Sequence, residues 1–185
     1  MGAADLSAAL WQERRHLELL LFRLETQRLH VLAGNLQWLG LTASEVESVL
    51  ESLRFEALAR SVESAAVAVE WGLPAQATLL ELSEGAPAGS WPEVLHEHLA
   101  GLRGLLSQLA DAARASEELL TNLNPPESFG TPPAVPAGTG NNAGTGADTA
   151  GTLERLTLAA NIERALTITR RTTQPLLRQY LGDEN

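Results

Sequence analysis

The sequence predicts an all-α protein: a long antiparallel helical hairpin or bundle of three long helices, followed by a tethered C-terminal helix. The first seventy residues contain no proline and are rich in Leu, Ala, Glu, Arg and Gln, which lose little on entering a helix. Apolar residues recur at helical spacing in four segments. A stretch of Pro, Gly, Ala, Thr and Asn separates the last of these segments from the others.

The first helix is expected from about residue 4 to residue 37. One apolar residue recurs every seventh position, and three further leucines widen the stripe. At ~1.5 Å per residue this helix would be about 50 Å long, which makes it a rod. The stripe consists of Leu10, Leu17, Leu24, Val31 and Trp38, with Leu20, Leu21 and Leu32.

A second helix is expected to begin at Thr42 and to end at the sequence Trp71–Pro74. Gly34 and Gly40 bracket the break before it, and Thr42 and Glu45 have the spacing of a capping box, which satisfies two free amides. Because the connecting loop is short, the first two helices should form an antiparallel hairpin. The expected buried face comprises Val46, Leu50, Leu53, Ala57, Leu58, Val62, Ala65 and Val69.

A third long helix is expected after Ser90, which is a favourable N-cap residue. The pattern before it leaves open whether residues 75–84 are helical. Gly101 and Gly104 weaken the helix locally and also permit a close helix contact. Its buried stripe is Leu95, Leu99, Leu102, Leu106, Leu109, Ala113 and Leu120.

Three segments follow from this pattern: a helical core at 1–123, a flexible linker at 124–151 and a C-terminal amphipathic helix at 152–185. The linker has six Gly and five Pro, so it cannot bury enough apolar surface to offset its ordering entropy. Pro175 predicts that the last helix kinks or ends near Thr173. Its apolar face carries Leu158, Ile162, Ala165, Thr169, Leu176 and Tyr180.

The composition excludes several classes of function. The chain has 185 residues and a formal charge of -10, and all 13 of its basic residues are Arg, without a basic stripe. Nucleic acid is therefore not expected as a partner. The absence of cysteine excludes disulfides, thiol catalysis and cysteine-ligated metals. The sequence also shows no signal peptide or long apolar run, so we expect a cytoplasmic protein without membrane insertion.

Two Glu-x-x-His pairs have the spacing found in di-iron helical bundles. Glu93 and His96 fall toward the solvent side of the third helix. Glu13, in the pair with His16, falls near the buried stripe of the first helix, but a single half-site cannot hold a metal. We therefore interpret both pairs as solvated charges and expect no metal and no cofactor.

The remaining polar residues do not form a recognisable catalytic motif. The lone His30 and the sequence His96–His98 are expected at the surface or the rim of the bundle. Arg14 and Arg15 are expected to pair with Glu25 or with acids of the second helix in exposed ion pairs. No nucleophile stands in a catalytic or phosphate-binding context, so the chain is not expected to be an enzyme.

Long helices with wide apolar stripes can present a groove for a foreign amphipathic helix, gripped at positions i, i+3, i+4 and i+7. The alternative is a closed four-helix bundle in which the C-terminal helix simply completes the core. Periodicity alone does not decide between these two arrangements.

Three stretches carry a resemblance to a known family: LWQERRHLELLLFRLE at 10–25, VLAG at 31–34 with Trp38 and Leu39, and EVE at 45–47. This succession resembles the FlgN family of flagellar export chaperones over about residues 5–123, and more loosely over 152–182. The resemblance implies a small, acidic, all-helical cytoplasmic protein that binds the C-terminal amphipathic helices of hook-associated proteins. Such a protein keeps them unassembled and delivers them to the flagellar type III export gate.

The resemblance places partner binding in the C-terminal helical region, and it likens Tyr180 to the near-terminal tyrosine that such chaperones offer to the export gate. We hypothesise that the C-terminal helix fills the client groove when it is empty and is displaced by the client. We expect a monomer or weak dimer. The partner-binding residues are then Leu158, Ile162, Ala165, Leu166, Thr169, Leu176 and Tyr180.

Two other functions remain open from the sequence. The first is a helical bundle that associates with itself through the same stripes and serves as a structural or adaptor protein with no secretion role. The second is an iron-binding bundle.

Overall fold

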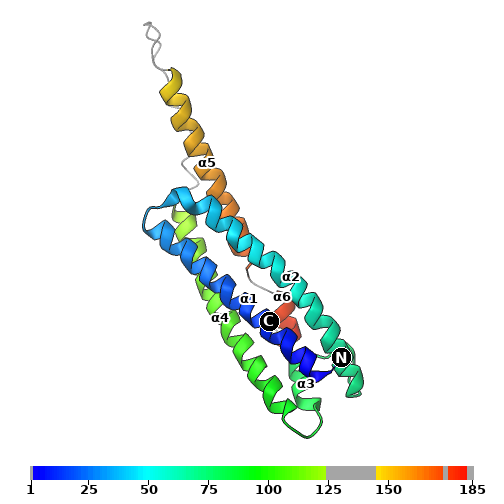
Figure 1. Ribbon diagram of the computed structural model, residues 1–185. Helices are drawn as coiled ribbons and strands as arrows, with labels where there is room; N and C mark the ends of the chain where they lie inside the picture. Colours follow the sequence, from blue (N-terminus) through cyan, green and yellow to red (C-terminus); the bar gives the residue numbers. More distant parts are fainter. Residues whose placement is uncertain (1, 124–144, 173–174, 183–185) are drawn as a thin grey trace.

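The computed structural model describes residues 2–123, 145–172 and 175–182, and these residues form helices and loops without any strand (Figure 1). The expected all-α fold class is confirmed. No helix in the described part of the chain has the length and apolarity needed to cross a bilayer. The long helices are α1 (Ala3–Leu32), α2 (Leu39–Glu70), α4 (Trp91–Leu123) and α5 (Thr145–Arg170), and the short ones are η1 (Leu36–Trp38), α3 (Leu79–Gly85) and α6 (Pro175–Leu181).

The helices form a four-position bundle (Figure 1). Helix α1 packs against both α2 and α4, and α5 packs against the same two helices. Helix α6 lies beyond the C-terminal end of α5 along the bundle and contacts α3. Helices α5 and α6 together therefore form the fourth helical position of the bundle. The N-terminal part of α5 extends beyond the end of the other helices (Figure 1). The chain therefore adopts the closed arrangement in which the C-terminal segment completes the core.

The apolar stripes predicted for α1 and α4 mostly lie in the core. In α1 the stripe holds as far as Val31, but Leu32, which was predicted to widen it, is 59% exposed. All seven predicted stripe residues of α4 are buried. Helix α1 ends at Leu32 because Gly34 adopts a positive φ of 75° and Asn35 N donates to the His30 carbonyl at 2.9 Å. Trp38 therefore lies outside α1, in η1, and is 47% exposed, contrary to the prediction.

The predicted capping box at Thr42 was wrong. Helix α2 begins three residues earlier, at Leu39, which places Leu39 in the core. Thr42 is buried inside the helix and its hydroxyl donates to the Leu39 carbonyl at 3.2 Å. The Glu45 carboxylate instead accepts a hydrogen bond from Arg23 of α1 at 3.0 Å. The earlier start of α2 is favoured because it buries an additional leucine, Leu39.

The predicted buried face of α2 is correct only in its first half. Val46, Leu50 and Leu53 are buried as expected, but three residues of the second half, Leu58, Val62 and Val69, are 65%, 51% and 66% exposed. The inward positions of that half are Arg60, Ser64, Val67 and Ala68. The helix has this orientation because Arg60 pairs with an acidic residue of α1 inside the bundle.

The segment left open at 75–84 contains helix α3 from Leu79 onward. Thr78 begins it with a capping box, in which Thr78 Oγ1 accepts from Glu81 N at 3.2 Å and Glu81 Oε2 accepts from Thr78 N at 2.7 Å. Helix α4 then begins at Trp91, directly after Ser90 as expected.

The C-terminal segment consists of two helices. Helix α5 begins at Thr145, seven residues before the expected start at 152, and the rest of the expected linker, 124–144, lies outside the described residues. The expected break near Thr173 is confirmed, since α5 ends at Arg170 and α6 begins at Pro175. Proline at the first helical position lacks only an amide that the helix does not need.

Candidate helix-binding channel

The C-terminal helices fill a lengthwise channel between α2 and α4. Helix α5 is tied at both rims: Arg164 Nη2 lies 2.6 Å from Glu47 of α2, and Arg170 Nε lies 2.7 Å from Glu117 of α4. The channel thus combines an apolar floor with carboxylates on its rims, which is the chemistry that an amphipathic helix requires. The residues that α5 and α6 place in the core are Ile162, Ala165, Leu166, Ile168, Leu177 and Leu181.

The seven predicted partner-binding residues mostly face this channel. Ile162, Ala165, Leu166 and Thr169 are buried, and Leu158 and Tyr180 are half-buried against the core. Leu176 is 73% exposed, and its neighbour Leu177 is buried in its place. One continuous helix would have put Leu176 on the same face as Thr169, but the break between α5 and α6 changes the rotational phase.

The contact between α5 and the channel has polar defects. Thr169 and Thr172 are each 1% exposed, and Thr172 Oγ1 donates to the Thr169 carbonyl at 2.6 Å. The Thr169 hydroxyl is buried without a hydrogen-bond partner, which costs about 1–3 kcal/mol. The occupying helix is therefore not an optimal match to the channel.

Three helices meet at a buried polar cluster formed by Glu13, Arg60 and Tyr180. Glu13 Oε2 of α1 lies 2.6 Å from Arg60 Nε of α2, and the guanidinium carbon of Arg60 lies 4.0 Å from the centre of the Tyr180 ring of α6. A desolvated cation over an aromatic face is a favourable contact. This cluster therefore ties α6 to the α1–α2 hairpin.

The interpretation of Glu13 as a solvated charge was wrong, because Glu13 is 2% exposed and pairs with Arg60 inside the bundle, a partner that the sequence analysis did not find. Arg60 stands seven residues after Leu53 and seven before Val67, so all three share one face of α2. This seven-residue spacing in the sequence could have predicted that Arg60 faces the core. Contrary to the prediction, the described ion pairs do not join Arg14 or Arg15 to Glu25 or to an acid of α2. Arg14 pairs with Glu18 of its own helix, and Glu25 pairs with Arg28.

Burial governs the titration of this cluster. Burial raises the pKa of the Glu13 carboxyl above its ordinary value of 4.5, and the opposing effect of Arg60 is smaller. Burial likewise raises the pKa of the Tyr180 phenol above its ordinary value. The Tyr180 hydroxyl is enclosed, so the tyrosine likened to a gate-binding residue is not presented to solvent in this arrangement.

The histidines divide into exposed and buried ones. Glu93 and His96 are exposed as predicted, and the described residues contain no group of three or more His, Asp or Glu able to hold a metal. The prediction for His98 was wrong, because His98 is 3% exposed. A ring nitrogen of His98 lies 2.9 Å from Ser7 Oγ, and its ring meets that of Trp11 edge-on at 5.3 Å. Ser7 and Trp11 lie one turn apart on α1, so together they enclose the imidazole.

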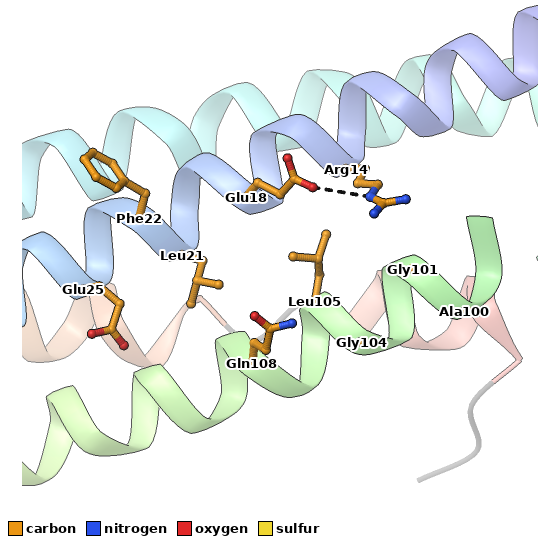
Figure 2. Close-up of a pocket in the computed structure, with 10 residues that line it drawn as sticks. All are labelled: Arg14, Glu18, Leu21, Phe22, Glu25, Ala100, Gly101, Gly104, Leu105 and Gln108. Carbon is orange, nitrogen blue, oxygen red and sulfur yellow. Dashed lines mark hydrogen bonds and ion pairs between the residues drawn. The ribbon is translucent and has the colours of Figure 1, made fainter. Parts of the chain in front are cut away.

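A second, open groove runs between α1 and α4 (Figure 2). It has a volume of about 660 Å³. Gly104 leaves its side open, because a Cβ there would have no neighbour within 4 Å, whereas at Gly101 a Cβ would lie 2.9 Å from Arg14 Nη1. The charged wall residues Arg14 and Glu18 pair with each other at 3.4 Å. The lining consists of Arg14, Glu18, Leu21, Phe22, Glu25, Ala100, Gly101, Gly104, Leu105 and Gln108.

Comparisons of the chain with models of protein families, with curated proteins and with solved structures found no match.

Proposed function

We propose that this chain is a cytoplasmic, non-enzymatic export chaperone of the FlgN type. It binds the C-terminal amphipathic helices of hook-associated proteins, prevents their premature assembly and delivers them to the flagellar type III export gate. The observation that carries the proposal is the channel between α2 and α4, which accommodates an amphipathic helix along its length. The resemblance of the α1 sequence to that family supplies the identity of the client.

The channel sets the chemistry of the client helix. Its apolar floor accepts side chains at the spacing of Ile162, Ala165 and Thr169, which is that of one helical face. On the rims, Glu47 and Glu117 pair with arginines six positions apart in α5. A client helix with an unbroken apolar face and basic residues near its two edges would reproduce these contacts and replace the buried threonines with larger apolar groups.

In this proposal, the client exchanges with α5 and α6. The client can displace the C-terminal helices because their contact with the channel is imperfect. Thr169 leaves a buried hydroxyl without a hydrogen bond, and the helix is interrupted after Arg170. An exchange of this kind requires a differential affinity of a few kcal/mol. Release of α6 would also withdraw the Tyr180 ring from Arg60 and present it to the export machinery, which links client loading to delivery.

A reversible lock between α2 and α5 tests the proposal. A Cβ at Gly40 would lie 3.3 Å from Asn161 Cγ, so Gly40→Cys with Asn161→Cys places two thiols at disulfide distance. The chain has no other cysteine, so oxidation yields a single defined crosslink. Binding of a peptide with the sequence of a hook-associated protein C-terminal helix is measured by calorimetry in both redox states.

We expect the reduced protein to bind the peptide and the oxidised protein to bind it at least tenfold more weakly, corresponding to about 1.4 kcal/mol. The single variant Gly40→Cys is the matched control and should be insensitive to oxidation. Equal affinity in both redox states would mean that the client binds another surface, such as the α1–α4 groove. If neither state bound any hook-associated helix, the chaperone function itself would be refuted.

A further inference from the structure

The outward face of the second half of α2 carries a continuous apolar seam, which we call the α2 seam. Phe55, Leu58, Val62 and Val69 are 74%, 65%, 51% and 66% exposed, and Ala65 between them is half-buried. Their positions follow a 3-4-3-4 spacing, which is the pattern of a helix that packs against one other helix in a coiled coil. The seam spans four turns of the helix.

The bundle keeps this seam outside at a cost to its own core. The opposite face of the same turns buries Arg60 and Ser64, although four apolar side chains, Phe55, Leu58, Val62 and Val69, remain exposed on the outer face. Rotating α2 to bury Phe55 and Leu58 would expose the Glu13–Arg60 pair and release Tyr180. A contiguous apolar stripe of this kind on a surface marks an interaction site.

We propose that the α2 seam is a homodimer interface, in which the α2 helices of two copies pack antiparallel. This inference is independent of the proposed chaperone function and concerns a different face of α2 from the one that contacts α5. A two-fold interface uses the same patch on both copies, so the seam has to be complementary to itself.

The side-chain volumes provide that complementarity. When two α2 helices are centred on residue 60 in antiparallel orientation, Phe55 of each copy lies opposite Ala65 of the other, and Leu58 lies opposite Val62. The largest residue thus meets the smallest one, and two residues of medium size meet each other. This alternation of large and small groups fills the contact from residue 55 to residue 65, and Val69 lies beyond it, opposite Glu51 of the other copy.

The charges favour the same orientation. The positions beside the middle of the seam, Ala59, Ser61 and Ala66, carry no charge, so the net charge of -10 does not bring like charges together there. Arg54 stands at one end of the seam and is 64% exposed, and Glu70 stands at the other end. In this antiparallel register Arg54 of one copy lies four positions along the partner helix from Glu70, and Glu51, which pairs with Arg54 in its own chain, lies opposite Val69. A parallel pair would instead place Arg54 beside Arg54 and Glu70 beside Glu70.

Sedimentation equilibrium of the full chain over a wide concentration range tests this inference. We expect the mass to rise with concentration from the 19.8 kDa of one chain toward twice that value. The variant Phe55→Glu with Val62→Glu places carboxylates in the seam and should remain monomeric throughout. The matched control, Phe22→Glu with Leu29→Glu, changes a phenylalanine and an aliphatic residue of similar exposure on α1 and should dimerise like the parent chain.

Cysteine crosslinking tests the orientation, because the parent chain has no cysteine. A mixture of Phe55→Cys and Ala65→Cys proteins should form a mixed disulfide dimer, and Phe55→Cys alone should not. Crosslinking of Phe55→Cys to itself would overturn the antiparallel arrangement. A chain that stays monomeric at every concentration, or a seam variant that still dimerises, would overturn the interface. If the monomer instead bound an amphipathic peptide that the seam variant lost, the seam would belong to a foreign helix and the dimer proposal would be wrong.

Discussion

Glu13 and Arg60 form an ion pair of 2.6 Å inside the bundle, with side chains that are only 3% and 6% exposed. Their pairing joins α1 to α2 at the level where α6 arrives, since the guanidinium also covers the ring of Tyr180. It also fixes the rotation of α2, because Arg60 can point inward only if Phe55, Leu58 and Val62 point outward. The buried ion pair and the exposed apolar seam therefore both follow from the same rotational orientation of α2.

Replacing both members of the pair should stabilise the bundle. Burial of both charges costs more free energy than a well-packed apolar pair of similar volume, so Glu13→Leu with Arg60→Met should raise the free energy of unfolding by about 1–4 kcal/mol. Arg60→Met alone should lower it by about 3–5 kcal/mol at neutral pH, because Glu13 is left buried without its partner. Urea denaturation followed by circular dichroism measures both. A double variant less stable than Arg60→Met would contradict the argument.

The raised pKa of Glu13 predicts a particular pH dependence of stability. Folding favours the protonated carboxyl, so the stability that Glu13 contributes is fully present below its ordinary pKa of 4.5 and is lost as the pH rises through the raised value. Relative to Glu13→Gln, which does not titrate, the parent chain should lose stability as the pH increases from 4.5. Urea denaturation at a series of pH values gives both free energies of unfolding, and a parent chain that gains stability relative to Glu13→Gln as the pH rises would refute the assignment.

The stripes of α1 and α4 could be predicted because leucines recur at helical spacing along the length of each helix. Leu10, Leu17 and Leu24 in α1, and Leu95, Leu99 and Leu102 in α4, set the inward face although α1 also carries exposed apolar residues such as Phe22. Helix α2 has apolar residues on two faces after Leu53, and periodicity cannot choose between them. The choice depends on the contact between Arg60 and Glu13, which are 47 positions apart in the sequence, so local pattern did not predict it.

The buried face of α5 could be predicted from the spacing of its residues, whereas the buried face of α6 could not. Ile162, Ala165 and Thr169 follow an uninterrupted helical spacing, and the prediction that they share a face is correct. Leu176 follows the break that Pro175 introduces, and the phase of a new helix after such a break depends on where it docks. His98 was assigned to the surface because the residues that enclose it, Ser7 and Trp11, come from another helix.

Burial of His98 predicts a loss of stability in mild acid. Burial lowers the pKa of this imidazole below its ordinary value of 6.5, so its contribution is fully present above pH 6.5 and is lost as the pH falls through the lowered value. His98→Gln removes the titrating group, and the stability of the parent chain relative to this variant should therefore fall below pH 6.5. His96→Gln, at an exposed position on the same turn, is the matched control. A parent chain that gains stability relative to His98→Gln in acid would contradict the burial of the ring.

The two glycines of the α1–α4 groove provide the most direct test of its geometry. Gly104→Ala should stabilise the chain by about 0.5–1 kcal/mol, because alanine is the better helix former and its Cβ would meet no atom within 4 Å. Gly101→Ala gains the same propensity but places its Cβ 2.9 Å from Arg14 Nη1, so the guanidinium that pairs with Glu18 must shift. The gain at residue 101 should therefore be the smaller one in urea denaturation. Equal gains would mean that Arg14 does not hold its place over Gly101, and a loss at residue 104 would mean that the groove beside it is closed in solution.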